Sequence, residues 1–282
     1  MAETKIIMRH LLTVLTTLFL VCGLSAQEYS WKAVPMDGSR AGCRYATPED
    51  IDESIGKIED GAYTAPNGRK FRKNSDVAEV ASIVLAAQPV MAAKKEIIGY
   101  SDHEITEGKP ESELSNLIID LIMEEVHEVT GKPVHIGILN FGGIRADLPS
   151  GNILMDDVES MLPFINYLVY VEHKGSKIRS ILESMAPRRF QVLGGVRIVV
   201  ENDQISSIEI DGEPLDDEKV YGMATISFLL YGGDGLNLAQ DALVVEQLDA
   251  IVNEPVMKYI RKETAAGRKI GYRKDGRITI RK

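Results

Sequence analysis

The sequence predicts a protein of mixed α/β class (α+β), and three observations carry that prediction. Residues 111–130 place apolar side chains at steps of three and four, the pattern of an amphipathic helix. Residues 134–139 form a short apolar run, which is typical of a buried strand. Residues 195–200 and 205–210 are two further strand patterns, joined through Asn202-Asp203, a strong hairpin signal.

Length and composition bound the class of protein. A chain of 282 residues can form one large domain or two modest ones. Its hydrophobic content of 44% and charged content of 26% are ordinary for a soluble globular protein. The net charge of −10 argues against nucleic acid as a general partner.

The N-terminus has the pattern of a secretory signal peptide. The apolar run 11–24 follows the basic residues Lys5 and Arg9, and Ala26 offers a small-residue cleavage site. We therefore expect residues 1–26 to be removed and the protein to be exported to the periplasm or secreted. The apolar run is too short to span a bilayer, so we expect no stable membrane span after cleavage.

Two cysteines, Cys22 and Cys43, are present. Lipidation at Cys22 is disfavoured because Val21 is a poor residue before a lipidated cysteine. Cleavage near Ala26 then leaves Cys43 alone, without an internal disulfide partner, so the fold must depend on its core.

Residues 27–73 are predicted to be a loosely structured N-terminal arm, because proline and glycine interrupt them closely. A short helix is expected from Thr47 through Ile58. The aromatic residues of the arm are interpreted as anchors that attach it to the main domain: Trp31, Tyr45, Tyr63 and Phe71. Residues 74–282 are predicted to form that main domain.

The elements of the main domain follow in order. A helix is expected from Ser75, with Val80, Ile83, Val84 and Ala87 as its buried stripe, and then a short strand over 97–100. The helix over 111–130 should bury one face and leave its acidic residues in solvent. Its expected buried residues are Leu114, Leu117, Ile118, Leu121, Ile122 and Val129.

The C-terminal half continues with mixed elements. A short helix after Asp156 is expected to end at Pro163. The later elements are predicted as strand 167–174, helix 176–185, strand 221–226, strand 243–245 and helix 252–262. Residues 268–282 carry a net charge of +6, interpreted as a terminal hairpin with a solvated charged edge and a turn at Lys274-Asp275-Gly276.

Several kinds of chemistry find no support in the sequence. The histidines show no H-E-x-x-H or H-x-H spacing, so a self-contained metal site is not expected. There is no phosphate-binding P-loop, no dinucleotide fingerprint and no G-x-S-x-G nucleophile motif. The sequence therefore predicts no catalytic residue, no metal and no cofactor.

The remaining evidence for a binding function lies in two glycine-rich turns. The turn from Asn140 to Arg145 follows strand 134–139 and offers an amide and a guanidinium, which suits a planar anion. The second turn offers Phe228 and, six residues later, Asp234, which can accept hydrogen bonds from a vicinal diol. Phe164 supplies a second ring. Taken alone each phenylalanine fits a core position, but together these groups match the base, sugar and phosphate of a nucleotide.

These segments resemble the C-terminal domain of the 5′-nucleotidase family. The resemblance lies in the order and spacing of four segments between Ile98 and Leu243: 140–151, 157–166, 175–183 and 228–235. It implies a mixed α/β domain with mixed sheets flanked by helices.

The resemblance also implies roles for single residues. Phe164 and Phe228 would sandwich a nucleobase, Asn140 and Asp234 would hold the ribose, and Arg145 would reach toward a phosphate. The predicted substrate-binding residues are Asn140, Gly142, Gly143, Arg145, Phe164, Phe228, Gly233 and Asp234.

Two features depart from the family pattern. Family members carry an N-terminal metallophosphoesterase domain with two metals, and no counterpart is recognisable in residues 27–70. Family members also place an arginine at the start of the helix that corresponds to 111–130. This chain has Pro110 or Glu111 there, with Lys109 nearby and no arginine between Arg72 and Arg145.

The sequence thus favours an exported nucleotide- or nucleoside-binding domain, the substrate-recognition half of a 5′-nucleotidase-type hydrolase of nucleotide catabolism. A separately encoded metallophosphoesterase would then supply catalysis. One alternative is a stand-alone protein that captures nucleosides, which the lost arginine favours. Another is a domain kept only for protein interaction through residues 27–73.

Overall fold

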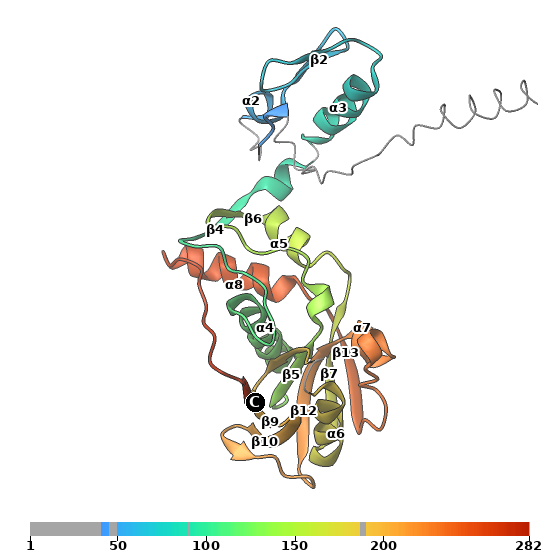
Figure 1. Ribbon diagram of the computed structural model, residues 1–282, viewed down its shortest axis with the longest axis vertical. Helices are drawn as coiled ribbons and strands as arrows, with labels where there is room; N and C mark the ends of the chain where they lie inside the picture. The colour runs from blue at the N-terminus through green and yellow to red at the C-terminus, as the bar shows by residue number, and fades with distance from the viewer. Residues whose placement is uncertain (1–40, 45–49, 90, 187–189, 282) are drawn as a thin grey trace, which may run out of the picture. The chain divides into compact units, whose positions relative to one another are not determined.

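The computed structural model describes residues 41–44, 50–89, 91–186 and 190–281 (Figure 1). The predicted signal peptide 1–26 and the aromatic residues Trp31 and Tyr45 lie outside the described residues. The chain divides into two compact units: of the described residues, 41–44 and 51–81 belong to the first, and 50 and 82–281 to the second. Within the described ranges, no helix has both the length and the apolar character needed to cross a membrane.

The first unit is built around a small antiparallel sheet in the order β1-β2-β3. Tyr63 on the central strand stacks on Phe71, with ring centroids 5.7 Å apart, and its hydroxyl donates to the Ile55 carbonyl at 2.8 Å. Burial and the nearby thiol of Cys43 raise the pKa of Tyr63 to about 12. The elements are α2 (Ile51–Ile55), β1 (Lys57–Glu59), β2 (Ala62–Thr64) and β3 (Lys70–Phe71). The helix expected from Thr47 to Ile58 ends earlier, at Ile55, because β1 begins at Lys57, and Thr47 lies outside the described residues.

The helix expected from Ser75 is present as α3 (Asp76–Ala87), but its predicted buried stripe is wrong. Val80 and Ile83 are 59% and 66% exposed, and Ala78 is the buried residue of the helix. Helical spacing marks a face that could be buried, but it does not supply a partner for that face.

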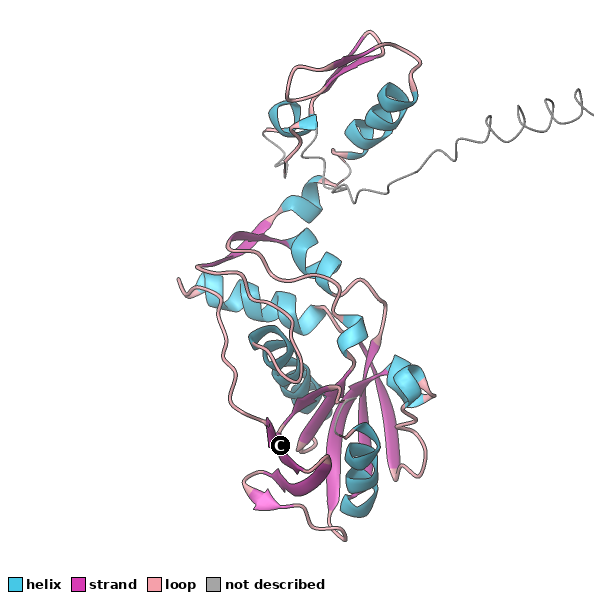
Figure 2. Ribbon diagram, viewed as in Figure 1, coloured by secondary structure: helices cyan, strands magenta, loops and turns pink. Residues whose placement is uncertain are grey.

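The second unit contains a five-stranded mixed sheet in the order β13-β7-β12-β5-β8 (Figure 2). The central strand β12 runs parallel to β5 and antiparallel to β7, and β13 and β8 pair antiparallel with β7 and β5. The bounds are β5 (Ile136–Leu139), β7 (Tyr167–Lys174), β8 (Val192–Gly194), β12 (Val220–Ile226) and β13 (Val244–Ile251). Buried apolar residues of these strands and the adjoining helices form one core.

Helices pack against this sheet. The longest, α4 (Glu113–Thr130), packs on β5, β8, β12 and β7, and α6 (Gly175–Met185) packs on β7. Ser112 caps α4: its hydroxyl accepts from the Ser115 amide at 3.0 Å. Val129 was expected in the core but is exposed, and Val126 is buried in the last turns instead. Further helices of this unit are η2 (Ala92–Lys95), α5 (Met155–Met161), α7 (Ser227–Leu230) and α8 (Glu254–Ala265).

Two smaller sheets complete the second unit. One pairs β4 (Ile97–Ser101) with β6 (Gly151–Leu154). The other has the order β11-β10-β9-β14 and contains the predicted hairpin, in which Asn202 and Asp203 both have positive φ. Its bounds are β9 (Val196–Glu201), β10 (Gln204–Ile210), β11 (Glu213–Pro214) and β14 (Ile278–Arg281). The mixed α/β class with mixed sheets flanked by helices is confirmed.

The terminal hairpin expected over 268–282 is wrong. The last strand, β14, lies parallel to β9 at the edge of the sheet. Arg277, expected in solvent, is 5% exposed: it donates to both oxygens of Asp120, to both oxygens of Asp275 and to the Leu193 carbonyl. The long-range partners Asp120 and Leu193 draw the tail inward, and local sequence pattern does not reveal such partners.

Candidate functional site

The predicted site residues converge on one edge of the five-stranded sheet. Because β5 and β12 are parallel, their carboxyl ends lie at the same edge, and Asn140 and Phe228 follow those ends. Strand β7 is antiparallel to β12, so it begins at this edge, three residues after Phe164. The Tyr167 amide donates to the Ser227 hydroxyl oxygen at 3.1 Å and ties the two loops together.

The first glycine-rich turn is a 3-10 turn, η3 (Phe141–Gly143), directly after β5. Asn140 is 5% exposed, and its Oδ1 atom lacks a hydrogen-bond partner in the described part of the chain. A buried polar atom without a partner is costly and is a common mark of a site that a ligand or water completes. The Phe141 amide donates to Gln191 Oε1 at 3.0 Å, which holds the turn against the chain leading into β8.

Both glycines of this turn leave room around the Asn140 amide. A Cβ atom on Gly143 would lie 2.9 Å from Asn140 Oδ1, a distance that real Cβ atoms do not show. A Cβ on Gly142 would lie 3.4 Å from Asn140 Nδ2. A side chain at Gly143 would therefore have to displace the Asn140 amide group.

The second turn, η4 (Gly233–Gly235), follows the short helix α7 that carries Phe228. Gly232 has a φ of 104°, and Asp234 has a φ of 50°, a left-handed conformation that aspartate tolerates better than most residues. A Cβ on Gly233 would lie 2.3 Å from the Phe228 carbonyl oxygen and 2.7 Å from its ring. Glycine at this position lets the turn close directly onto Phe228.

The two turns meet at Gly142 and Asp234. A Cβ atom on Gly142 would lie 3.7 Å from Asp234 Oδ2, within van der Waals distance. Asp234 and Gly142 are both exposed, so the carboxylate is open to solvent beside the backbone of the first turn. The structure thus brings together Asn140, Gly142, Gly143, Gly233 and Asp234.

Both predicted rings are accessible at the same edge. Phe164 and Phe228 are 47% and 44% exposed. The ring contacts among the described aromatic residues are Tyr63–Phe71 and His135–Tyr221, so Phe164 and Phe228 do not stack on each other. Large rings this exposed are available to stack on a planar ligand.

Arg145 ends the first turn and is exposed. Its amide donates to the Met161 carbonyl at 2.8 Å, which fixes the backbone, and its Nη1 lies 3.5 Å from the Gly142 carbonyl oxygen. No carboxylate of the described residues lies within ion-pair distance of the guanidinium. A guanidinium without an internal carboxylate partner is available to bind an anion.

The start of α4 is occupied by Glu111, whose carboxylate is directed to the C-terminal segment. Its Oε1 accepts from the Gly276 amide at 3.0 Å and its Oε2 from Asn116 Nδ2 at 3.1 Å. Glu111 also lies 3.9 Å from Nε of the buried Arg277, so its carboxylate has a structural role and faces an arginine that is withdrawn from solvent.

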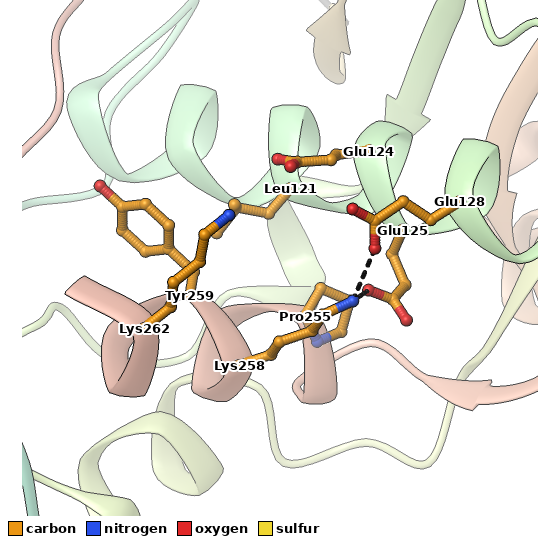
Figure 3. A pocket seen from close by; sticks show the side chains of 8 residues that line it. All are labelled: Leu121, Glu124, Glu125, Glu128, Pro255, Lys258, Tyr259 and Lys262. Atoms are coloured by element: carbon orange, nitrogen blue, oxygen red, sulfur yellow. Dashed lines mark hydrogen bonds and ion pairs between the residues drawn. The ribbon is translucent and has the colours of Figure 1, made fainter. Parts of the chain in front are cut away.

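A separate groove lies between α4 and α8 (Figure 3). Lys258 crosses it and donates to both Glu125 and Glu128 at 2.7 Å. These hydrogen bonds raise the pKa of Lys258 and lower the pKa of Glu128. The groove is thus bridged by an ion-pair cluster, and none of the predicted site residues lines it. No group of three or more His, Cys, Asp or Glu side chains suited to a metal occurs within the described ranges.

The structure adds residues that the sequence reasoning did not select. Gln191 holds the first turn, Ser227 links β7 to α7, and the Thr225 hydroxyl donates to the Ile138 carbonyl at 2.9 Å. Each acts on a residue more than 45 positions away, so no local motif could have identified it.

A family model described as "5′-nucleotidase, C-terminal domain" matches residues 90–241. Protein UshA of Yersinia enterocolitica is 34% identical over 103 residues, which are 35% of this chain and 19% of that protein. The trifunctional nucleotide phosphoesterase protein YfkN of Bacillus subtilis is 27% identical over 206 residues, which are 66% of this chain and 14% of that protein. The chain thus spans about a fifth or less of the length of these curated relatives.

Solved structures give the same result for the fold. The 5′-nucleotidase precursor from Thermus thermophilus is 27% identical, with a TM-score of 0.62 over 77% of this chain and 45% of that chain. The NAD nucleotidase of Haemophilus influenzae is 18% identical, with a TM-score of 0.55 over 78% of this chain and 48% of that chain. At that identity the second likeness concerns the fold alone.

Proposed function

Because the chain belongs to the family of 5′-nucleotidase C-terminal domains, we propose that it binds a nucleoside or nucleotide. In this role it is the substrate-recognition part of a 5′-nucleotidase-type hydrolase. The observation that carries the proposal is the meeting of the two glycine-rich turns at Gly142 and Asp234, beside two half-exposed phenylalanine rings.

Each group has a chemical role in this proposal. Phe164 and Phe228 stack on the two faces of the base, and such stacking is worth about 1–3 kcal/mol per base. Asp234 accepts hydrogen bonds from the ribose hydroxyls, and the Asn140 amide completes the hydrogen bonding of the sugar. Arg145 donates to the phosphate.

We assign the metal-dependent step of hydrolysis to a metallophosphoesterase on a separate polypeptide that docks beside this site. Such a partner would activate a water molecule on its metal ions. The support is that residues 51–71 form a small helix and sheet and that the matched family is a C-terminal domain.

A phosphatase assay tests this assignment. The purified full chain, incubated with Mg²⁺, Mn²⁺ or Co²⁺, should release phosphate from AMP, or UMP from a UDP-sugar, no faster than the buffer blank. Robust metal-dependent turnover would contradict the assignment and place catalysis in this chain.

Export is part of the proposal and rests on the signal-peptide pattern of residues 1–26. Mass spectrometry of the mature protein tests it. A new N-terminus near Gln27 in the periplasmic or extracellular fraction is expected, whereas an intact N-terminus in the cytoplasm would contradict export.

A second candidate function is capture of nucleosides without hydrolysis. Glu111 favours this second function. It stands where family members place an arginine, so this position supplies no positive charge to a phosphate, and its carboxylate is instead bound to Gly276 and Asn116. Calorimetry with adenosine and AMP distinguishes the two, because nucleoside capture predicts equal or tighter binding of adenosine.

A further inference from the structure

Lys109 lies against the first glycine-rich turn. Its ammonium nitrogen is 5.2 Å from the centroid of the Phe141 ring, and Phe141 is the residue between Asn140 and Gly142. An ammonium over an aromatic face is held there by the ring quadrupole, at a modest gain for an exposed cation. Lys109 is therefore placed beside the turn, although it is more than thirty positions away in sequence.

The segment that carries Lys109 is attached to the segment that carries Arg145. Ile105 and Leu148 exchange both backbone hydrogen bonds, at 3.0 and 3.1 Å. The Glu107 amide donates to Asp147 Oδ1 at 2.6 Å. Lys109 lies two residues after Glu107, and Arg145 lies two residues before Asp147. The two cations therefore flank the same turn.

Both cations are exposed and have no carboxylate of the described residues within ion-pair distance. Several other lysines of this unit are paired, as in Lys132–Glu246, Lys174–Glu218 and Lys177–Asp241. Asp147, the carboxylate nearest to Arg145 in sequence, accepts from the Glu107 amide instead. Two free cations at one turn form a positive spot on a chain with a net charge of −10.

We infer that Lys109 is a specificity-determining residue that binds the phosphate of a nucleotide together with Arg145. The inference rests on the proposed function and deepens it, because it makes a 5′-phosphorylated nucleoside the preferred ligand. Arg145 supplies a planar fork of donors, and Lys109 supplies a compact point charge on a flexible stem. This pair would replace the charge missing at the start of α4, where Glu111 serves the tail.

The test is calorimetry of the full chain with AMP and with adenosine, extended to the other purine and pyrimidine pairs if neither binds. The variants are Lys109→Met, which removes the charge, and Lys109→Arg, which keeps it. Lys219→Met is the matched control: Lys219 also lies over a ring, 4.8 Å from the Tyr221 centroid, but at the opposite end of β12.

We expect the unmodified chain to bind the monophosphate at least tenfold more tightly than the nucleoside. Lys109→Met should remove about tenfold of that advantage, the usual cost of losing a charge-assisted hydrogen bond. Nucleoside affinity should stay unchanged, Lys109→Arg should restore the preference, and Lys219→Met should change neither affinity.

Three results overturn the inference, and they differ from one another. Equal binding of nucleoside and monophosphate would remove the phosphate role and leave nucleoside recognition intact. A monophosphate preference that survives Lys109→Met would assign it to Arg145 alone. Absence of binding by every nucleoside and monophosphate tested would overturn the proposed function itself, and this inference with it.

Discussion

Gly142 and Asp234 face each other across the two glycine-rich turns: a Cβ atom on Gly142 would lie 3.7 Å from Asp234 Oδ2. The parallel pairing of β5 and β12 produces this contact, because it brings the ends of both strands to one edge. A residue with no side chain therefore sits between a buried amide, Asn140, and an exposed carboxylate. Small additions at this point should affect ligand binding far more than folding.

Gly142 and Gly233 should respond differently to substitution by alanine. Gly142→Ala places its methyl group at ordinary distances from its neighbours, so stability should change by less than about 0.5 kcal/mol while nucleoside affinity falls. Gly233→Ala must displace the Phe228 carbonyl from 2.3 Å and should cost about 1–3 kcal/mol. Urea unfolding and calorimetry measure both effects, and Gly271→Ala is an unstrained control. Equal destabilisation by Gly142→Ala and Gly233→Ala would show that the turns are packed differently.

The two rings should contribute to binding and not to stability. Phe164→Ala and Phe228→Ala each remove one stacking face, so nucleoside affinity should fall by about 1–3 kcal/mol for each. Both side chains are about half exposed, so unfolding midpoints should stay close to the parent value. Tyr100→Ala, a similarly exposed ring on β4, is the control. Unchanged affinity in the double variant would contradict the stacking role of the two rings, whereas a domain kept only for protein interaction predicts that the double variant keeps its function.

The tail should depend on Arg277. Arg277→Met removes the guanidinium donor from the Leu193 carbonyl and from the carboxylates of Asp120 and Asp275, of which Asp120 keeps the Tyr272 hydroxyl as a donor. We expect a loss of about 3 kcal/mol in unfolding free energy, at the low end for a broken buried pair because both carboxylates are partly exposed. Urea unfolding measures it, with the exposed pair variant Arg281→Met as a control that should lose less than about 1 kcal/mol. A small effect of Arg277→Met would mean that water replaces the guanidinium.

Stability should fall in mild acid because of His173. This side chain is fully buried on β7, with Nε2 2.9 Å from the Leu238 carbonyl oxygen. Burial lowers the pKa of His173, Lys177 lowers it further, and the Leu238 and Asp241 carbonyls and the Asp241 carboxylate oppose the shift. The unfolded chain therefore binds a proton below about pH 6.5 that the folded chain does not bind, so unfolding free energy decreases as pH falls through that value.

His173→Gln tests the sign of this effect. Glutamine keeps an N–H donor and removes the titration, so its unfolding free energy should change less between pH 7.5 and 5.5 than that of the parent. A parent protein that is equally stable at both pH values would contradict the burial effect.

The sequence contained enough to predict most elements of the second unit. Strands 134–139, 167–174 and 221–226 are present as β5, β7 and β12, and the hairpin at Asn202-Asp203 has the positive φ angles that its residues favour. These features depend on local periodicity and turn chemistry, both of which a single chain displays.

The errors concern partners distant in sequence. The apolar stripe of α3 is exposed although its spacing is helical, and Arg277 is buried although its neighbours are charged. Gln191 follows Phe141 in the sequence, and the pairing of β5 with β8 brings the two residues together. Lys109 precedes Phe141, and the bridge between Ile105 and Leu148 brings its segment to the same turn. The predicted site residues remain a prediction about ligand binding, although the structure brings their positions together.

Calorimetric titration of the full chain with a panel of nucleosides and their 5′-monophosphates decides whether this edge of the sheet is a nucleotide site. We expect saturable binding of one ligand per chain, weakened at least about fivefold by Phe164→Ala, Phe228→Ala or Asp234→Asn and unchanged by Tyr100→Ala. Binding that survives all three site variants, or the absence of binding by every member of the panel, would contradict it.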